Sequence, residues 1–263
     1  MEGEDPWLDE MMSDVTKALV LVPTYNEAAV IERLISRFSD VRKSLVQGDN
    51  DLAIDLQLLI IDDNSPDGTA ELVEKMNLNW IRVMRREKKS GLGPAYIAGF
   101  KEALKEDFQL MIEMDADLSH QPEQLVDLMI PVINNQCDLT IGTRWMPGGK
   151  VINWPISRQL ISRMGTGYAR FALRLKLRDI TSGFRVFHRR VIERIDLDAI
   201  EARGYGFQIE MTLRTLDAGF QVQEVPITFV EREGGVSKMS KKIVLEALWK
   251  VTIWGLRSLI KSR

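Results

Sequence analysis

Three stretches of this sequence run from an apolar, strand-like segment directly into a cluster of polar residues. They are KALVLVPTYNE (17–27), IDLQLLIIDD (54–63) and FQLMIEMD (108–115). Shorter apolar runs at 80–86 and 137–143 predict two more strands. Between the runs, helical spacing of apolar residues covers 27–46, 67–77, 93–106 and 122–134. This alternation predicts an α/β fold with a mostly parallel mixed sheet and helices on both of its faces.

The strict alternation stops after Thr143, and the rest of the chain is assigned segment by segment. We expect a loop at 144–158, a helix over about 157–176, a return to the sheet at 180–188, a helix over 205–219, and an extended segment at 220–232. The chain then divides into an acidic tail that we expect to be disordered (1–16), a catalytic domain (17–242) and an amphipathic helix (243–263).

The composition constrains where the protein works. Residues 1–14 carry six acidic side chains and no basic one, which is the opposite of a signal peptide. The lone Cys137 cannot form an intrachain disulfide and fits a reducing compartment. No apolar run approaches the roughly 20 residues that a membrane span needs. We therefore predict a cytoplasmic protein.

Basic residues are concentrated in two regions of a chain whose formal net charge is −3. From Leu139 to Arg178 there are eight basic residues and no acid, and from Lys238 onward there are seven basic residues against one acid, Glu246. Either run alone is typical of a solvated surface. Together they make an anionic partner a hypothesis to test; we expect no nucleic acid.

The polar clusters PTYNE, DDNSPDG and DADLSHQP all follow predicted strands, so in a parallel sheet they line one edge. A dinucleotide-binding G-x-G-x-x-G after the first strand and a G-x-x-x-x-G-K-[ST] phosphate loop are both missing from the sequence. Asp115 and Asp117 form a D-x-D pair, which suits Mg²⁺ or Mn²⁺ held together with the phosphates of a substrate.

Seven motifs occur in the order seen in dolichol-phosphate or polyprenol-phosphate mannose synthases, which are GT-A fold enzymes of glycosyltransferase family 2. They are PTYNE (23–27), DDNSPDGT (62–69), GLGPAY (91–96), MDADLSHQP (114–122), GTRW with GG (142–149), DITSGFR (179–185) and FVEREGGVSK (229–238). The last three together are the most specific. The sequence resembles this family from Lys17 to Lys242.

The resemblance implies a metal-dependent, inverting transfer of mannose from GDP-mannose to dolichyl or polyprenyl phosphate. It implies nucleotide-sugar contacts at Pro23, Tyr25, Glu27, Ile61, Asp63, Asp115, Ala116 (through its backbone) and Asp117. It implies a metal at Asp115 and Asp117, and catalytic roles for Asp117, Arg144, Arg232 and Lys238. One departure is Trp145, which stands where the family usually has Tyr and brings an aromatic face without the hydroxyl.

The chemistry fits this pattern, because a polyprenyl phosphate is largely a dianion at neutral pH and needs no strong general base. Neither histidine is therefore expected to be a catalyst. We expect the acceptor phosphate in the acid-free region, at Arg144, Arg158 and Ser162. Arg170, Arg174 and Arg178 are spaced as one outward helical stripe.

The segment 243–263 predicts an amphipathic, basic helix. It can lie on the cytoplasmic face of a membrane, bind a small membrane subunit, or pack on the domain. Two alternative functions are a synthase that moves glucose or another hexose to the same lipid, and a non-catalytic regulatory subunit that binds a nucleotide sugar.

Overall fold

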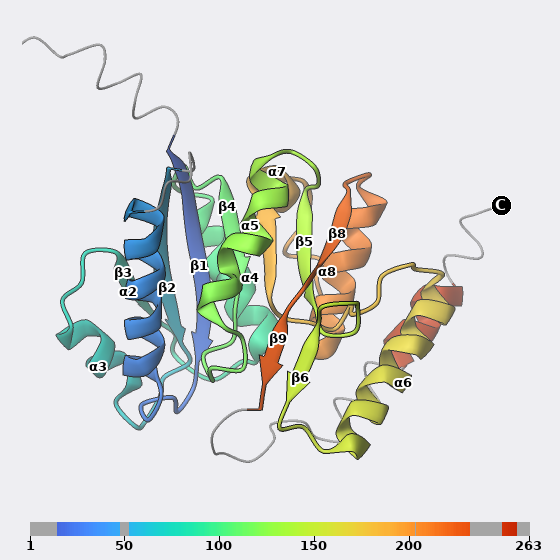
Figure 1. Ribbon diagram of the computed structural model, residues 1–263, viewed down its shortest axis with the longest axis horizontal. Coiled ribbons are helices and arrows are strands. Elements are labelled where there is room, and N and C mark those ends of the chain that lie inside the picture. Colours follow the sequence, from blue (N-terminus) through green and yellow to red (C-terminus); the bar gives the residue numbers. More distant parts are fainter. Residues whose placement is uncertain (1–14, 48–52, 203, 232–248, 257–263) are drawn as a thin grey trace, which may run out of the picture.

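The computed structural model describes residues 15–47, 53–202, 204–231 and 249–256. A seven-stranded sheet in the order β3-β2-β1-β4-β7-β5-β8 forms its centre (Figure 1). The strands are β1 (Thr16–Thr24), β2 (Ile54–Asp62), β3 (Ile81–Arg85), β4 (Leu110–Glu113), β5 (Leu139–Thr143), β7 (Arg185–His188) and β8 (Val222–Pro226). Only β7 among them runs antiparallel to its neighbours, so the mostly parallel mixed sheet predicted from the sequence is confirmed.

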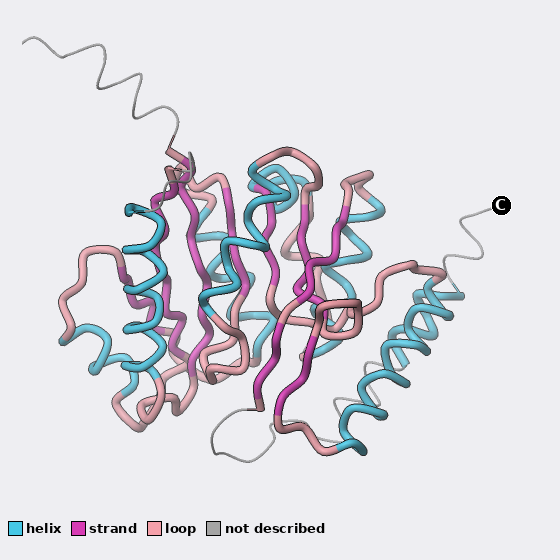
Figure 2. Tube along the Cα trace, in the orientation of Figure 1, coloured by secondary structure: helices cyan, strands magenta, loops and turns pink. Residues whose placement is uncertain are grey.

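Helices cover both faces of the sheet, as predicted (Figure 2). One core contains side chains of α2 (Ile31–Gln47), α3 (Thr69–Lys75) and α5 (Leu125–Ile133), which follows the short helix η1 (Pro122–Gln124). The other contains side chains of α4 (Leu92–Ala103), α7 (Arg189–Arg194) and α8 (Tyr205–Asp217). Strand β1 lies between them: Val20 and Val22 face the first core, and Leu19 and Leu21 face the second. This alternation follows from the two-residue period of a strand.

The predicted return of 180–188 to the sheet is confirmed as β7, and two other elements differ from the sequence prediction. Strand β7 is inserted between β4 and β5, a position that local periodicity did not specify. The expected loop at 144–158 contains a short strand, β6 (Lys150–Ile152), which pairs in parallel with β9 (Thr228–Val230). Helix α6 (Ile156–Leu173) ends earlier than predicted, because Arg174 adopts a left-handed conformation with φ 55°. Arg174 and Arg178 therefore do not continue a helical stripe with Arg170.

Helix α6 stands beside the sheet rather than on it and packs against a second helical segment, 249–256 (Figure 1). Ala169 and Leu173 form a small core with Val251, Ile180 and Ile209. Of the predicted helix 243–263, this segment is the only part among the described residues. None of the helices in the described ranges is long and apolar enough to cross a membrane.

Candidate active site

The polar motifs after β1, β2 and β4 meet at one edge of the sheet. The three strands are parallel, with Thr24 opposite Asp62 and Leu21 opposite Glu113. Their carboxyl ends therefore point the same way (Figure 1), as predicted for a ligand site in such a fold.

The loops after β1 and β2, here called the paired loops (residues 23–28 and 62–69), are joined by Asp62. This buried carboxylate accepts hydrogen bonds from Thr24 Oγ1 at 2.8 Å, from Ser65 Oγ at 2.6 Å and from the Ser65 N–H at 2.8 Å. The Asn26 N–H in turn donates to Ser65 Oγ at 3.0 Å. Asp62 thus fixes one loop against the other.

Asp67 and Thr69 make a second link between the paired loops. Asp67 accepts from the Ala28 N–H at 3.0 Å and from Thr69 Oγ1 at 2.6 Å, and the Glu27 N–H donates to Thr69 Oγ1 at 3.0 Å. Partial burial opposes ionisation of Asp67, but these hydrogen bonds together hold its pKa below the ordinary value. An ionised Asp67 therefore helps to preform this end of the site.

Among the residues predicted to contact the nucleotide sugar, Asp63 forms an ion pair and Ile61 is buried in the core. Arg86 Nη1 lies 2.5 Å from Asp63 Oδ1, and the Ser90 N–H donates to its Oδ2 at 3.1 Å. Ile61 is fully buried in the core, so its side chain supports the site from below. Pro23, Tyr25 and Glu27 are partly exposed, and Lys89 Nζ lies 3.8 Å from the centre of the Tyr25 ring.

Asp115 and Asp117 are half-buried at the exit of β4, with the backbone of Ala116 between them. Asp117 Oδ1 accepts the Ser119 N–H at 3.1 Å, which turns the chain after the motif. The Asp115 N–H donates to His120 Nδ1 at 3.2 Å. His120 therefore orients the turn.

His120 is a buried, neutral ring that joins the two carboxylates to the next part of the site. Burial lowers its pKa to about 4, the charge of Asp117 opposes this change, and the charge of Arg144 adds to it. Nδ1 lies 3.7 Å from Asp115 Oδ2, but a neutral ring that accepts a hydrogen bond forms no ion pair there. The Phe229 ring packs edge-on against His120 and also lies 5.2 Å from the Arg144 guanidinium carbon, so one aromatic ring connects this turn to Arg144.

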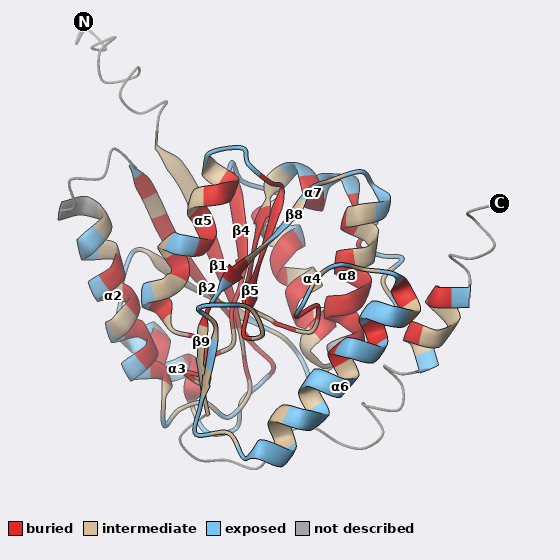
Figure 3. Ribbon diagram, turned by 45° about the vertical axis from the view of Figure 1, so that its right-hand side comes forward, coloured by how far each residue is buried: buried red, intermediate tan, exposed pale blue. Residues whose placement is uncertain are grey.

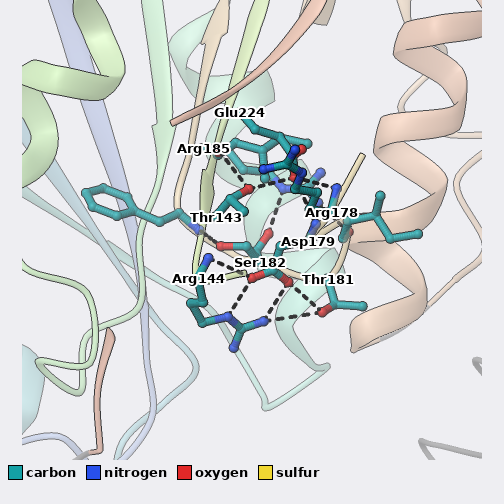
Figure 4. Close-up of polar contacts among 11 residues, drawn as sticks. Thr143, Arg144, Arg178, Asp179, Thr181, Ser182, Arg185 and Glu224 are labelled. Atoms are coloured by element: carbon teal, nitrogen blue, oxygen red, sulfur yellow. Dashed lines mark hydrogen bonds and ion pairs between the residues drawn. The ribbon is translucent and has the colours of Figure 1, made fainter. Parts of the chain in front are cut away.

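Arg144 follows β5 and is held by Asp179 in a buried, two-pronged ion pair (Figure 4). Its Nε and Nη2 atoms each donate to a different oxygen of Asp179 at 2.7 Å, and its backbone N–H adds a bond at 3.2 Å. Asp179 is fixed by Glu224, which accepts its N–H at 2.9 Å and Thr143 Oγ1 at 2.7 Å. Paired geometry of this kind fixes the plane of a guanidinium.

Aromatic rings surround the Arg144 guanidinium. Its carbon lies 5.6 Å from the ring centre of Trp145, 5.4 Å from that of Trp154 and 5.2 Å from that of Phe229. The indole N–H groups of both tryptophans are buried and have no hydrogen-bond partner among the described residues. We call these three rings with Arg144 and Asp179 the Arg144 cluster. Trp145 thus brings a donor to the position where the resemblance implies a hydroxyl.

A glycine closes the loop over this cluster. A Cβ atom on Gly149 would lie 2.6 Å from the Thr143 carbonyl oxygen and 2.8 Å from that of Arg144. Both contacts are with backbone, which cannot move aside easily, so a larger residue would displace Arg144. The GG pair of the GTRW motif therefore has a steric reason in this fold.

Glu113, two residues before Asp115 at the end of β4, is fully buried. Glu113 faces Arg185 across the β4–β7 pair, and Arg185 donates to the carbonyl oxygens of Ser182, Ile180 and Gln208. Burial raises the pKa of Glu113 to about 7, against the opposing charge of Arg185. The Gln208 side-chain amide lies near Glu113 but does not form a hydrogen bond with it. Both Glu113 oxygens therefore lack a hydrogen-bond partner among the described residues.

The remaining predicted residues lie on or near α6, or outside the described ranges. Arg158 forms an ion pair with Glu231 and lies 4.2 Å from the ring centre of Trp154, beside the Arg144 cluster. Ser162 is half-buried one turn further along α6. Arg232 and Lys238 lie outside the described residues.

The sequence reasoning missed Asp179 and Gln208. Asp179 is the first acid after the acid-free run that ends at Arg178, so a search for the counter-ion of Arg144 could have found it. Gln208 gives no local signal, because its place beneath Asp115 depends on how α8 packs. No group of three metal-binding side chains occurs among the residues that the structure places.

Comparison with known proteins decides the family. The profile of glycosyl transferase family 2 matches residues 19–196. The chain belongs to this family. It is 43% identical over 258 residues to the polyprenol monophosphomannose synthase of Mycolicibacterium smegmatis, covering 97% of this chain and 92% of that protein. The resemblance expected from the motifs is therefore confirmed.

Two further family members support the same grouping. The undecaprenyl-phosphate mannosyltransferase of Micrococcus luteus is 47% identical over 91% of this chain and 94% of its own length. The dolichol-phosphate mannosyltransferase of Pyrococcus furiosus is 38% identical over 88% of this chain and 62% of its own length.

Among solved structures, glucosyl-3-phosphoglycerate synthase from Mycobacterium tuberculosis is similar in fold. In complex with Mn²⁺, UDP-glucose and phosphoglyceric acid, it superposes with a TM-score of 0.63 at 20% identity, covering 95% of this chain and 85% of that one. At this identity the likeness supports the GT-A architecture and no more.

Proposed function

We propose that this glycosyltransferase moves mannose from GDP-mannose to a dolichyl or polyprenyl monophosphate, as a dolichyl-phosphate β-D-mannosyltransferase. The names of the relatives described above give mannose as the sugar and a polyprenyl or dolichyl phosphate as the lipid, at 38–47% identity to this chain. One observation carries the proposal further: Asp115 and Asp117 lie in the turn that His120 orients, and the His120 ring and the Arg144 guanidinium both pack against Phe229. A site for two anionic reactants needs such neighbouring but opposite charges.

In this proposal the paired loops bind the donor. Pro23, Tyr25, Glu27 and Asp63 surround the guanosine, and Ile61 supports them from the core. Asp115, the Ala116 backbone and Asp117 face the diphosphate. The two half-exposed carboxylates fit Mg²⁺ or Mn²⁺, since such ions take one or two carboxylates together with substrate phosphates. The ion offsets the charge that develops on the departing GDP.

Arg144, Arg158 and Ser162 hold the acceptor phosphate, and Arg232 and Lys238 add positive charge. Asp179 keeps the Arg144 guanidinium in one orientation, so little rearrangement is needed when the phosphate arrives. The phosphate is itself the nucleophile, and His120, with a pKa of about 4, takes no proton from it. Single displacement inverts the anomeric carbon, which gives a β-linked product from the α-linked donor.

The acceptor is a membrane lipid, so the proposal places the protein peripherally at the cytoplasmic face of a membrane. A small membrane subunit is a further candidate partner, through the segment 243–263.

A transfer assay tests the function. Purified protein is incubated with a short polyprenyl phosphate, Mg²⁺ or Mn²⁺, and labelled GDP-mannose or UDP-glucose in parallel. We expect label in the lipid phase from GDP-mannose alone, its loss with EDTA, and a β-anomeric proton signal in the product. Label from UDP-glucose alone would mean that the enzyme transfers glucose instead of mannose. Label from neither donor would contradict the proposal and favour a regulatory subunit.

A further inference from the structure

Helix α6 carries an exposed apolar stripe that the site does not use. Its members are Ile156, Leu160, Ile161, Met164, Tyr168 and Phe171. Ile156, Met164 and Phe171 are 76%, 73% and 86% exposed. At about 100° per residue the six side chains cover an arc of ~140°. We call these six residues the α6 stripe.

The opposite face of α6 is the one that packs on the protein. Thr166, Ala169 and Leu173 are buried, and Tyr168 at the edge of the stripe bonds Thr252 Oγ1 at 2.6 Å. The outer side of the helix is largely exposed in Figure 3. Most of the large apolar side chains of α6 thus point outward, unlike those of an ordinary surface helix, whose apolar face packs on the core. Contiguous exposed apolar side chains of this kind mark interaction surfaces.

Charge identifies the occupant of this surface. We propose that the α6 stripe docks on an anionic lipid surface, which deepens the proposed function and rests on it. Arg163 and Arg170 are exposed at one border of the stripe, and the whole run from Leu139 to Arg178 contains no acid. Basic side chains beside an apolar helix face favour the interface of an anionic membrane.

The same charges disfavour the other occupants. A second copy packed stripe against stripe would bring arginines against arginines. The segment from Lys238 to the end is also basic, with seven basic residues and one acid, so it is a poor electrostatic match. An anionic lipid surface complements both features of α6.

The position of α6 fits the delivery of a lipid phosphate. Its first residue, Ile156, follows Trp154 by two positions, and Trp154 contacts both Arg144 and Arg158. Docking along the stripe therefore brings the headgroup layer to the beginning of α6, beside the Arg144 cluster. A membrane-held acceptor then enters the site from the side of the protein that faces its bilayer.

Vesicle flotation tests the proposal with the full chain and no substrate. The vesicles contain phosphatidylcholine with or without phosphatidylglycerol. Met164→Glu and Phe171→Glu should each weaken binding to the anionic vesicles at least about tenfold, because each removes buried apolar area and adds a repelled charge. Phe171→Leu should retain binding. Leu78→Glu is the matched control: it makes the same charge change at an exposed apolar residue between α3 and β3.

Equal vesicle binding by wild type, Met164→Glu and Phe171→Glu would overturn the proposal. So would a wild-type dimer that both variants dissociate in analytical ultracentrifugation, since the occupant would then be a second copy. Transfer to a short, water-soluble acceptor should be unchanged in both variants. Docking through the stripe with no mannose transfer by the wild type would contradict the proposed function and leave the docking surface in place.

Discussion

The paired loops hold their shape through many short hydrogen bonds, whereas the Arg144 cluster depends on one buried ion pair among three aromatic rings. Apart from the buried Thr24–Asp62 bond, the bonds of the paired loops are at least partly exposed, so water can replace a lost partner. In the Arg144 cluster the charges are enclosed, and removal of one leaves the other without compensation. Single substitutions should therefore have graded effects in the first region and severe effects in the second.

Asp117 lies between these regions and should give the largest effect. Asp117→Ala should lower kcat/KM by at least about 10³-fold, because the charge of the departing diphosphate loses its counterpart. Thermal stability should change little, since Asp117 is half-exposed and its side chain accepts a backbone hydrogen bond from Ser119. Asp127→Ala, at an exposed position on α5, is the control. Unchanged turnover in Asp117→Ala would remove the metal from the mechanism.

Asp179→Ala should destabilise the fold by about 3 kcal/mol, because it leaves the Arg144 charge buried and unmatched. Chemical denaturation at neutral pH measures this change. The double variant Arg144→Ala/Asp179→Ala should recover part of the loss, since it removes both charges. If the two single effects simply add, Asp179 does not act through Arg144.

The buried Glu113 side chain, on β4 two residues before Asp115, gives a pH-dependent test. The unfolded carboxyl ionises near 4.5 and the folded one near 7, so the native state binds the extra proton between these values. Its contribution to stability is therefore present at low pH and lost as pH rises through about 7. The free energy of unfolding of Glu113→Gln, relative to that of wild type, should therefore increase by roughly 3 kcal/mol as the pH rises from 4.5 to 8.

Denaturation curves over this pH range measure the Glu113 effect, with Asp127→Asn as the exposed control. A constant difference between wild type and Glu113→Gln would mean that the carboxyl titrates normally in the folded protein.

The smallest effect should come from the paired loops. Asp67→Ala removes three acceptor contacts near the surface and should cost ~1 kcal/mol of stability, with weaker GDP binding. Calorimetry with GDP and thermal denaturation measure the two changes. A loss as large as that of Asp179→Ala would erase the contrast between the regions.

The strands, most helices and the paired loops could be predicted because they depend on local patterns. Apolar periodicity identifies β1 and β2, and the turn-forming residues after them identify the loop ends. The insertion of β7 and the pairing of Arg144 with Asp179 join residues far apart in sequence, and no local pattern specifies them.

The outer face of α6 was missed for a different reason. Apolar residues at helical spacing ordinarily indicate a buried face, and the sequence gives no sign that Ala169 and Leu173 are inside while Phe171 is outside. The membrane contact predicted for 243–263 stays a prediction, since most of that segment lies outside the described residues.

In the sheet, the insertion of β7 next to β4 also marks a boundary between two parts of the chain: strands β1 to β4 lie on one side of it, and β7, β5 and β8 lie on the other. Everything from β1 to Asp117 precedes β5 in the chain, and Arg144, α6 and Asp179 all follow it. A chimera joined in the segment between α5 and β5 would combine the paired loops of one family member with the Arg144 cluster of another. Within the sheet, the two parts of such a chimera meet at the β4–β7 pair, where Glu113 and Arg185 face each other. Those two residues should be inherited from the same parent.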